Sequence, residues 1–153
     1  MIRLVGAALV VIAMATALPM RAVAQDAAPA GAALQIQVVG LRSNNGRVGC
    51  SLYNSPNGFP RDESKIIKHA WAPAQNNQGT CTFSGLAPGT YAVAIFHDEN
   101  SNGKMDYNFL GIPKEGFGFT KDPTVTISAP SFQACSFNYS GAPLTEVIHI
   151  KYM

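Results

Sequence analysis

Charged residues are scarce in this sequence, and those present do not gather into a patch of one sign. They make up 13% of the 153 residues, with 11 basic and 9 acidic side chains. Proteins that bind nucleic acid through its phosphates carry a stripe or cluster of Lys and Arg. No such cluster is present, so we exclude nucleic acid from the expected partners.

Long hydrophobic runs are missing as well, apart from one near the N-terminus. It extends from Leu4 to Leu18, about 15 residues, whereas a membrane-spanning helix needs roughly 20. The run follows Arg3 and precedes the small-residue triplet Ala22-Val23-Ala24, which is the pattern of a secretory signal peptide. We therefore expect residues 1–24 to be a signal peptide that is cleaved after Ala24. The mature protein is then expected to be periplasmic or secreted, with no membrane span.

Cleavage would change the charge balance, because Arg3 and Arg21 leave with the signal peptide while all acidic residues stay. The mature chain would then carry 9 basic and 9 acidic residues. Residues 25–33 are small, contain Pro and lack periodicity, which indicates a flexible leader. The remaining residues, 34–153, have the length of a single domain with one hydrophobic core.

No segment has the periodicity of a long helix. Instead, apolar and polar residues alternate with period two over short segments separated by turn residues, which is typical of β-strands. The expected strands are residues 34–38, 48–52, 80–83, 90–97, 124–127, 135–139 and 146–152. About seven short strands of this kind predict an all-β fold, an antiparallel β-sandwich.

The turns indicate how these strands pair. Residues 40–46 contain Asn-Gly and connect the first two strands, which predicts a β-hairpin. Residues 84–89 connect the third and fourth strands, and we expect a second hairpin there. The fourth strand, 90–97, is apolar on both faces and is therefore expected in the middle of a sheet. Residues 62–71 fit either a short helical turn or an edge strand.

A polar loop follows directly after the fourth strand and carries the most informative motif, D-x-N-x-N-G. Oxygen-bearing residues stand in it at alternate positions: Asp98, Asn100, Asn102, Lys104 through its carbonyl, and Asp106. Hard oxygen ligands at this spacing wrap a cation such as Ca²⁺. The bidentate Glu that closes an EF-hand loop is replaced by Phe109, so we expect weak binding, with Glu115 as a further candidate ligand. The alternative is a tight polar turn without a cation.

The next segment, residues 107–119, combines three Phe with three Gly residues. One interpretation is a recognition loop that presents Phe109, Ile112, Phe117 and Phe119 to a partner. The other, which we favour from the sequence, is a long connection whose Phe109, Ile112 and Phe117 cover the open end of the sandwich and seal its core.

Cysteine is also sparse, with Cys50, Cys81 and Cys135 all on apolar faces of expected strands. In an oxidising compartment two of them are expected to form a disulfide. Three pairings are open. We prefer Cys50 with Cys81, because each stands in a hairpin strand that is expected to face the other sheet.

Common catalytic motifs are absent: the sequence contains no G-x-S-x-G, no H-E-x-x-H and no phosphate-binding glycine loop. We therefore expect a non-catalytic envelope module with a binding or structural role, whose partner would be an envelope protein, a glycan or a small ligand. The alternative is a small periplasmic hydrolase or ligand carrier. It would use His97, Asp98 and Glu115, with the histidine as general base.

Three segments together carry a family resemblance: GLAPGTYAV at 85–93, HDENSNGKMD at 97–106 and FLGIPKEGFGF at 109–119. They resemble DUF2141, a bacterial family of exported proteins of unknown function, and the resemblance extends over most of residues 34–139. The sequence departs from the family pattern near residues 123–128.

The turn L-x-P-G-x-Y within the first segment also resembles transthyretin-like and collagen-binding B-type modules. That resemblance implies an Ig-like or transthyretin-like β-sandwich. One enzymatic branch of the transthyretin-like group, hydroxyisourate hydrolase, ends in Tyr-Arg-Gly-Ser. This chain ends in Ile150-Lys151-Tyr152-Met153, so the resemblance does not imply that activity.

Overall fold

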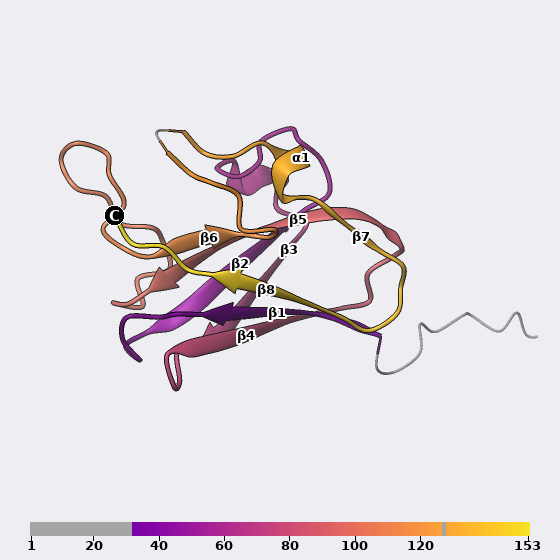
Figure 1. Cartoon of the computed structure of the whole chain (residues 1–153), viewed down its shortest axis with the longest axis horizontal. Coiled ribbons are helices and arrows are strands. Elements are labelled where there is room, and N and C mark those ends of the chain that lie inside the picture. Colours follow the sequence, from indigo (N-terminus) through magenta and orange to yellow (C-terminus); the bar gives the residue numbers. More distant parts are fainter. Residues whose placement is uncertain (1–31, 127) are drawn as a thin grey trace, which may run out of the picture.

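The computed structural model describes residues 32–126 and 128–153. The predicted signal peptide and residues 25–31 of the predicted leader lie outside this part. Within it the chain is mostly β, with two packed sheets and very little helix (Figure 1). None of its helices is long and apolar enough to cross a membrane. The two packed sheets confirm the predicted all-β sandwich.

The two sheets differ in size. The three-stranded sheet has the order β4 (Gln78–Ser84), β1 (Ala33–Val39) and β8 (Leu144–His149). The five-stranded sheet has the order β3 (Lys68–Pro73), β2 (Arg47–Tyr53), β5 (Gly89–Asp98) and β6 (Phe117–Phe119), with β7 (Phe137–Tyr139) paired to the start of β5. β5 is thus an interior strand, as its two apolar faces predicted.

The main core lies between the sheets and follows the period-two pattern. On β1 the alternate residues Leu34, Ile36 and Val38 are fully buried, while Gln35 is exposed. β2 and β5 contribute their alternate residues in the same way, because successive side chains of a strand point to opposite faces. A disulfide between Cys50 on β2 and Cys81 on β4 crosses this core and joins the sheets, as predicted.

The pairing of the strands corrects the sequence prediction. β1 pairs with β4 and β8, whereas β2 pairs with β3 and β5, so the first predicted hairpin is wrong. The second is wrong for the same reason, since β4 and β5 lie in different sheets. Both connecting turns cross the roughly 10 Å between the sheets, a distance that a few residues span. The β1–β8 pair is parallel, so the sandwich is not antiparallel throughout.

Several local predictions also change. Residues 124–126 form no strand, because Lys121 and Asp122 adopt positive φ and turn the chain away after β6; Ile127 lies outside the described residues. The expected strand at 135–139 is split between the helix α1 (Phe132–Cys135), which Ser131 caps, and β7. Residues 62–71 contain both alternatives, a 3₁₀ turn η1 (Glu63–Lys65) followed by the edge strand β3.

A second apolar layer lies on the outer face of the five-stranded sheet. Its buried members are Tyr53, Ala92, Phe117, Phe119, Phe132 and Cys135. The helix α1 and the segment 54–67 lie over one part of this face (Figure 1). The five-stranded sheet is therefore apolar on both sides, unlike a sheet whose outer face meets water.

Candidate functional site

The polar loop begins at Asp98, the last residue of β5, and folds back onto the carboxylate of that residue. Asp98 is fully buried. Its Oδ1 accepts a hydrogen bond from the backbone N–H of Asn102 at 2.9 Å, and its Oδ2 accepts one from that of Gly103 at 2.9 Å. Arg47 Nε also donates to Oδ2 at 3.0 Å and compensates the buried charge. The motif thus forms a compact turn around one carboxylate.

Two other predicted ligands, Asn100 and Asn102, meet the side chain of Asp106. The side-chain amides of Asn100 and Asn102 donate to Asp106 Oδ2 at 2.7 and 3.0 Å. Their carbonyl oxygens accept hydrogen bonds from the backbone N–H groups of Asn102 and Lys104. Both amide nitrogens face Asp106, so cation binding here would require the amides to rotate and give up these hydrogen bonds. In the arrangement described, the loop is held by its own hydrogen bonds.

Glu115 supports this loop from the far side. It is buried, and its two oxygens accept hydrogen bonds from the backbone N–H groups of Glu99 and Asp106 at 3.0 and 3.1 Å. Burial raises the pKa of the Glu115 carboxyl. Among residues 32–126 and 128–153, no three His, Cys, Asp or Glu side chains are grouped as a metal site.

His97 is buried, and both nitrogens of its imidazole ring form hydrogen bonds within the protein. Its side chain has no exposed surface. Nε2 lies 2.8 Å from the carbonyl oxygen of Asn45, which can only accept, so Nε2 carries the proton. Nδ1 lies 2.7 Å from the hydroxyl of Tyr152 and accepts from it when the ring is neutral. Both nitrogens are therefore occupied, and the geometry does not favour His97 as a general base.

A larger feature lies on the outer face of the five-stranded sheet. It is a groove of about 990 Å³. Its floor is the part of the sheet that α1 leaves open, with Trp71, Phe96 and Phe117 among its residues. Its walls come from residues 60–61, 63 and 66–67, from 103–105, 107 and 111–113, and from 125–126 and 128–129.

The aromatic floor is held in place by contacts between the strands. The rings of Trp71 on β3 and Phe96 on β5 meet edge to face, with centroids 5.6 Å apart. Both lie over Gly49 of the intervening β2, where a Cβ atom would stand 2.6 Å from Phe96 and 2.8 Å from Trp71. The Arg47 guanidinium stacks on the Trp71 ring at 3.8 Å from its centroid. Glycine at position 49 therefore allows the two rings to form one surface.

A minority of the residues that line the groove are polar or charged. Ser51 and His69 are cross-strand partners, and Ser51 Oγ lies 3.0 Å from His69 Nδ1. Partial desolvation on the sheet surface lowers the pKa of the His69 imidazole. The charged residues of the lining are Arg61, Glu63, Lys68 and Lys104, of which three are basic.

The residues of the predicted binding loop lie on the sheet face under the groove, in the groove wall and in solvent. Phe117 and Phe119 are buried on the outer face of β6 and line the groove, and Ile112 belongs to its wall. Phe109 is 96% exposed and seals nothing, so the sealing interpretation is wrong for this residue. Trp71 and Phe96 were not among the residues predicted from the sequence. Phe96 could have been recognised from the apolar outer face of its strand. Trp71 could not, because the sequence of its segment fitted either a helical turn or an edge strand.

A comparison with family models shows which family the chain matches. The model described as an uncharacterized protein conserved in bacteria, DUF2141, matches residues 36–146, which is more than half of the chain. No curated protein and no solved structure matches at a significant level.

Proposed function

Because the chain belongs to the DUF2141 family of uncharacterised bacterial proteins, we propose its function from the groove rather than from relatives. The protein is a non-catalytic binding module, and the groove takes a small ligand with a flat or extended apolar body. Its predicted signal peptide would place this module in the periplasm or outside the cell.

One observation carries the proposal: the outer face of the five-stranded sheet is hollow and aromatic where such a face is normally polar. Ligand pockets are typically about 300 to 1,000 Å³, mostly apolar, with a small number of polar groups that orient the ligand. The groove has this volume and this composition. An apolar ligand would gain about 25 cal/mol for each Å² of its surface that leaves water.

The polar groups of the groove favour a ligand with an acidic or hydrogen-bonding end. Ser51 and His69 offer one hydrogen-bonding pair at the floor. At the walls the basic side chains Arg61 and Lys104 outnumber the acidic Glu63, whereas Lys68 on β3 donates to the carbonyl of Ser84 at 2.6 Å. A carboxylate or sulfonate group would be attracted by this balance of charge.

Trp71 makes the proposal testable, because it is the single tryptophan of the chain and part of the groove floor. Titration with anilinonaphthalenesulfonate, a dye with a flat apolar body and an anionic group, should quench Trp71 fluorescence in a saturable, one-to-one manner. Ala94→Phe places a ring on the groove floor and should weaken binding at least about tenfold, or 1.4 kcal/mol.

The matched control is Gln35→Phe, which adds the same ring to the exposed face of the other sheet and should leave binding unchanged. Both variants should keep one cooperative melting transition, which separates binding from partial unfolding. The proposal fails if the wild-type protein shows no saturable binding, or if Ala94→Phe binds as well as the control.

A further inference from the structure

We propose that the tip of the loop between β5 and β6, Phe109 with Leu110, docks on an anionic lipid surface. This inference goes beyond the proposed function and does not depend on it. Phe109 is 96% and Leu110 68% exposed, although large apolar side chains normally avoid this degree of contact with water. The loop projects from one end of the sandwich, beside the C-terminus (Figure 1).

The tip is a hydrogen-bonded turn that holds both side chains outward. The backbone N–H of Gly111 donates to the carbonyl of Asn108 at 3.0 Å, and that of Asn108 donates to the carbonyl of Ile112 at 2.9 Å. The Asn108 side chain accepts two more hydrogen bonds from the backbone N–H groups of Leu110 and Ile112. Four hydrogen bonds across five residues keep the two apolar side chains at the apex.

The shape of the tip favours a fluid surface over a folded partner. A buried aromatic side chain covers about 150 to 250 Å², so two adjacent side chains fall well short of the roughly 800 Å² that each partner contributes to a stable protein interface. A second copy of this chain would meet the same limit. Hydrocarbon, by contrast, can surround a narrow apex from all sides and bury a ring that is exposed on both faces.

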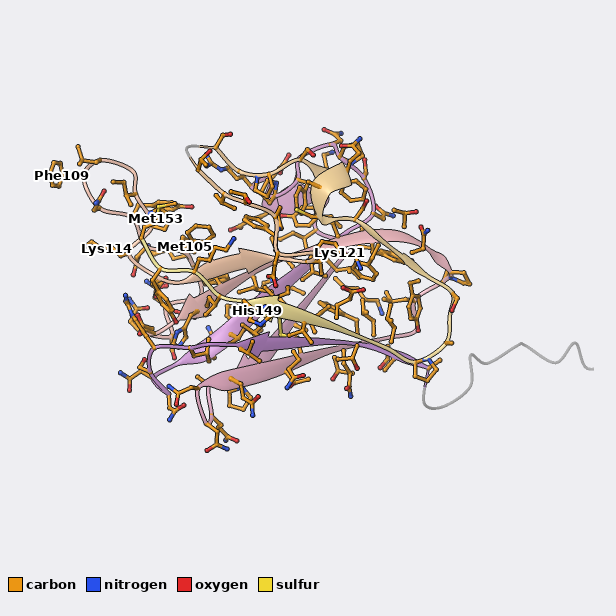
Figure 2. All side chains as sticks on the ribbon, viewed as in Figure 1. Met105, Phe109, Lys114, Lys121, His149 and Met153 are labelled. Atoms are coloured by element: carbon orange, nitrogen blue, oxygen red, sulfur yellow. A yellow bond between two sulfur atoms is a disulfide. The ribbon has the colours of Figure 1, made fainter. Side chains whose placement is uncertain are left out.

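The charges around the tip are complementary to anionic lipid headgroups. Lys104 and Lys114 are exposed on the two arms of the loop, and Figure 2 shows Lys114 at its base. The carboxylate between them in sequence, Asp106, turns inward and accepts hydrogen bonds from two asparagines. Tyr107 lies below the apex and is 52% exposed, and tyrosine is enriched at the level of the lipid headgroups in membrane-bound proteins.

Vesicle flotation of the full protein tests the inference. Vesicles of phosphatidylethanolamine and phosphatidylglycerol should carry the wild-type protein with them, and vesicles of phosphatidylcholine alone should carry less. Phe109→Ser/Leu110→Ser should lower the bound fraction at least tenfold. Lys104→Gln/Lys114→Gln should lower it less and remove most of its dependence on salt.

The matched control is Val147→Ser, an exposed apolar residue of β8 away from the tip, which should float like the wild type. Neither Phe109 nor Leu110 lines the groove, so dye binding should be unchanged in the double variant and the two proposals can fail separately. Wild-type protein that stays unbound with anionic vesicles overturns the inference. The inference is also overturned if the wild-type protein forms a dimer and does not bind vesicles, and if Phe109→Ser/Leu110→Ser dissociates that dimer. The tip would then contact a second copy of the chain.

Discussion

At the scale of single residues, the imidazole of His97 has no exposed surface and binds two distant segments at once. Its Nε2 donates to Asn45, in the turn before β2, and its Nδ1 accepts from Tyr152, near the C-terminus. The Tyr152 hydroxyl in turn accepts from the backbone N–H of Arg42. Replacing this side chain therefore affects both the connection before β2, which contains Arg42 and Asn45, and the C-terminal segment.

We predict that His97→Ala lowers the free energy of unfolding by about 2 to 4 kcal/mol. The change removes the hydrogen bonds of His97 to the Asn45 carbonyl and the Tyr152 hydroxyl and opens a cavity where the imidazole was fully buried. The measurement is the midpoint and slope of urea unfolding. His149→Ala is the control, because that exposed ring pairs with Asp122 at the surface and should cost less than about 1 kcal/mol. Equal midpoints for the two variants would contradict the structural role of His97.

Gly49 illustrates a different effect at the same scale. Its role is to leave space for the rings of Trp71 and Phe96, which a Cβ atom would displace. In the sequence this glycine was only a polar-face residue of a strand. Its importance depends on two aromatic residues from neighbouring strands, which only the pairing of β3, β2 and β5 brings together.

At the scale of elements, hydrogen bonds within the loop of residues 98–106 hold its conformation. Its side chains also carry oxygen atoms of the kind that bind a cation. Asp98 is committed to the turn and to Arg47, so its removal would disturb the loop as well as any cation site. Asp106 is the better probe, since it receives only side-chain donors within the loop.

We predict weak Ca²⁺ binding by this loop, with a dissociation constant of about 10⁻⁴ to 10⁻³ M, the range of extracellular modules. At about ten times that concentration, binding to the folded state alone adds about 1.4 kcal/mol of stability, which raises the melting temperature by a few degrees. Asp106→Asn removes one charge and should abolish the shift, whereas Asp122→Asn, outside the loop, should keep it.

The measurement is thermal unfolding in chelator and in about 10 mM Ca²⁺, in the range of ten dissociation constants. An unchanged melting curve for the wild-type protein would leave the loop as a polar turn. In that case its Asp and Asn residues serve only the hydrogen bonds described above.

At the scale of the whole molecule, the disulfide between Cys50 and Cys81 is the covalent link between the two sheets. The two cysteines are separated by 31 residues in sequence. Closing a loop of this length restricts the unfolded chain, and the associated stabilisation is about 3 to 4 kcal/mol. This is a large share of the 5 to 15 kcal/mol, roughly, that domains of ordinary size possess.

We predict that Cys50→Ala/Cys81→Ala lowers the free energy of unfolding by about that amount, measured by urea unfolding. Cys135→Ala is the control: this cysteine is buried and unpaired among the described residues, and burial raises its thiol pKa to about 11. Alkylation of the unfolded, non-reduced protein should label Cys135 alone. Labelling of all three cysteines would refute the disulfide.

Much of this architecture was predictable from the sequence because it depends on local physics. Period-two alternation marked β1, β2, β4 and β5, and the apolar content of both faces identified β5 as an interior strand. All three cysteines stood at core-facing positions, and the preference for Cys50 with Cys81 came from their places in strands expected to face each other. The D-x-N-x-N-G turn was recognisable because its hydrogen bonds join neighbours in the chain.

The tertiary structure alone decided which strands pair and, as a result, where the groove lies. Alternation determines the face to which a side chain points, but it carries no information about the neighbouring strand, so both predicted hairpins were wrong. Trp71, Phe96 and Phe117 come from β3, β5 and β6 and share one surface only because β2 and β5 lie between the outer strands. A site assembled from separate strands follows the strand order, and contacts between residues distant in sequence determine that order.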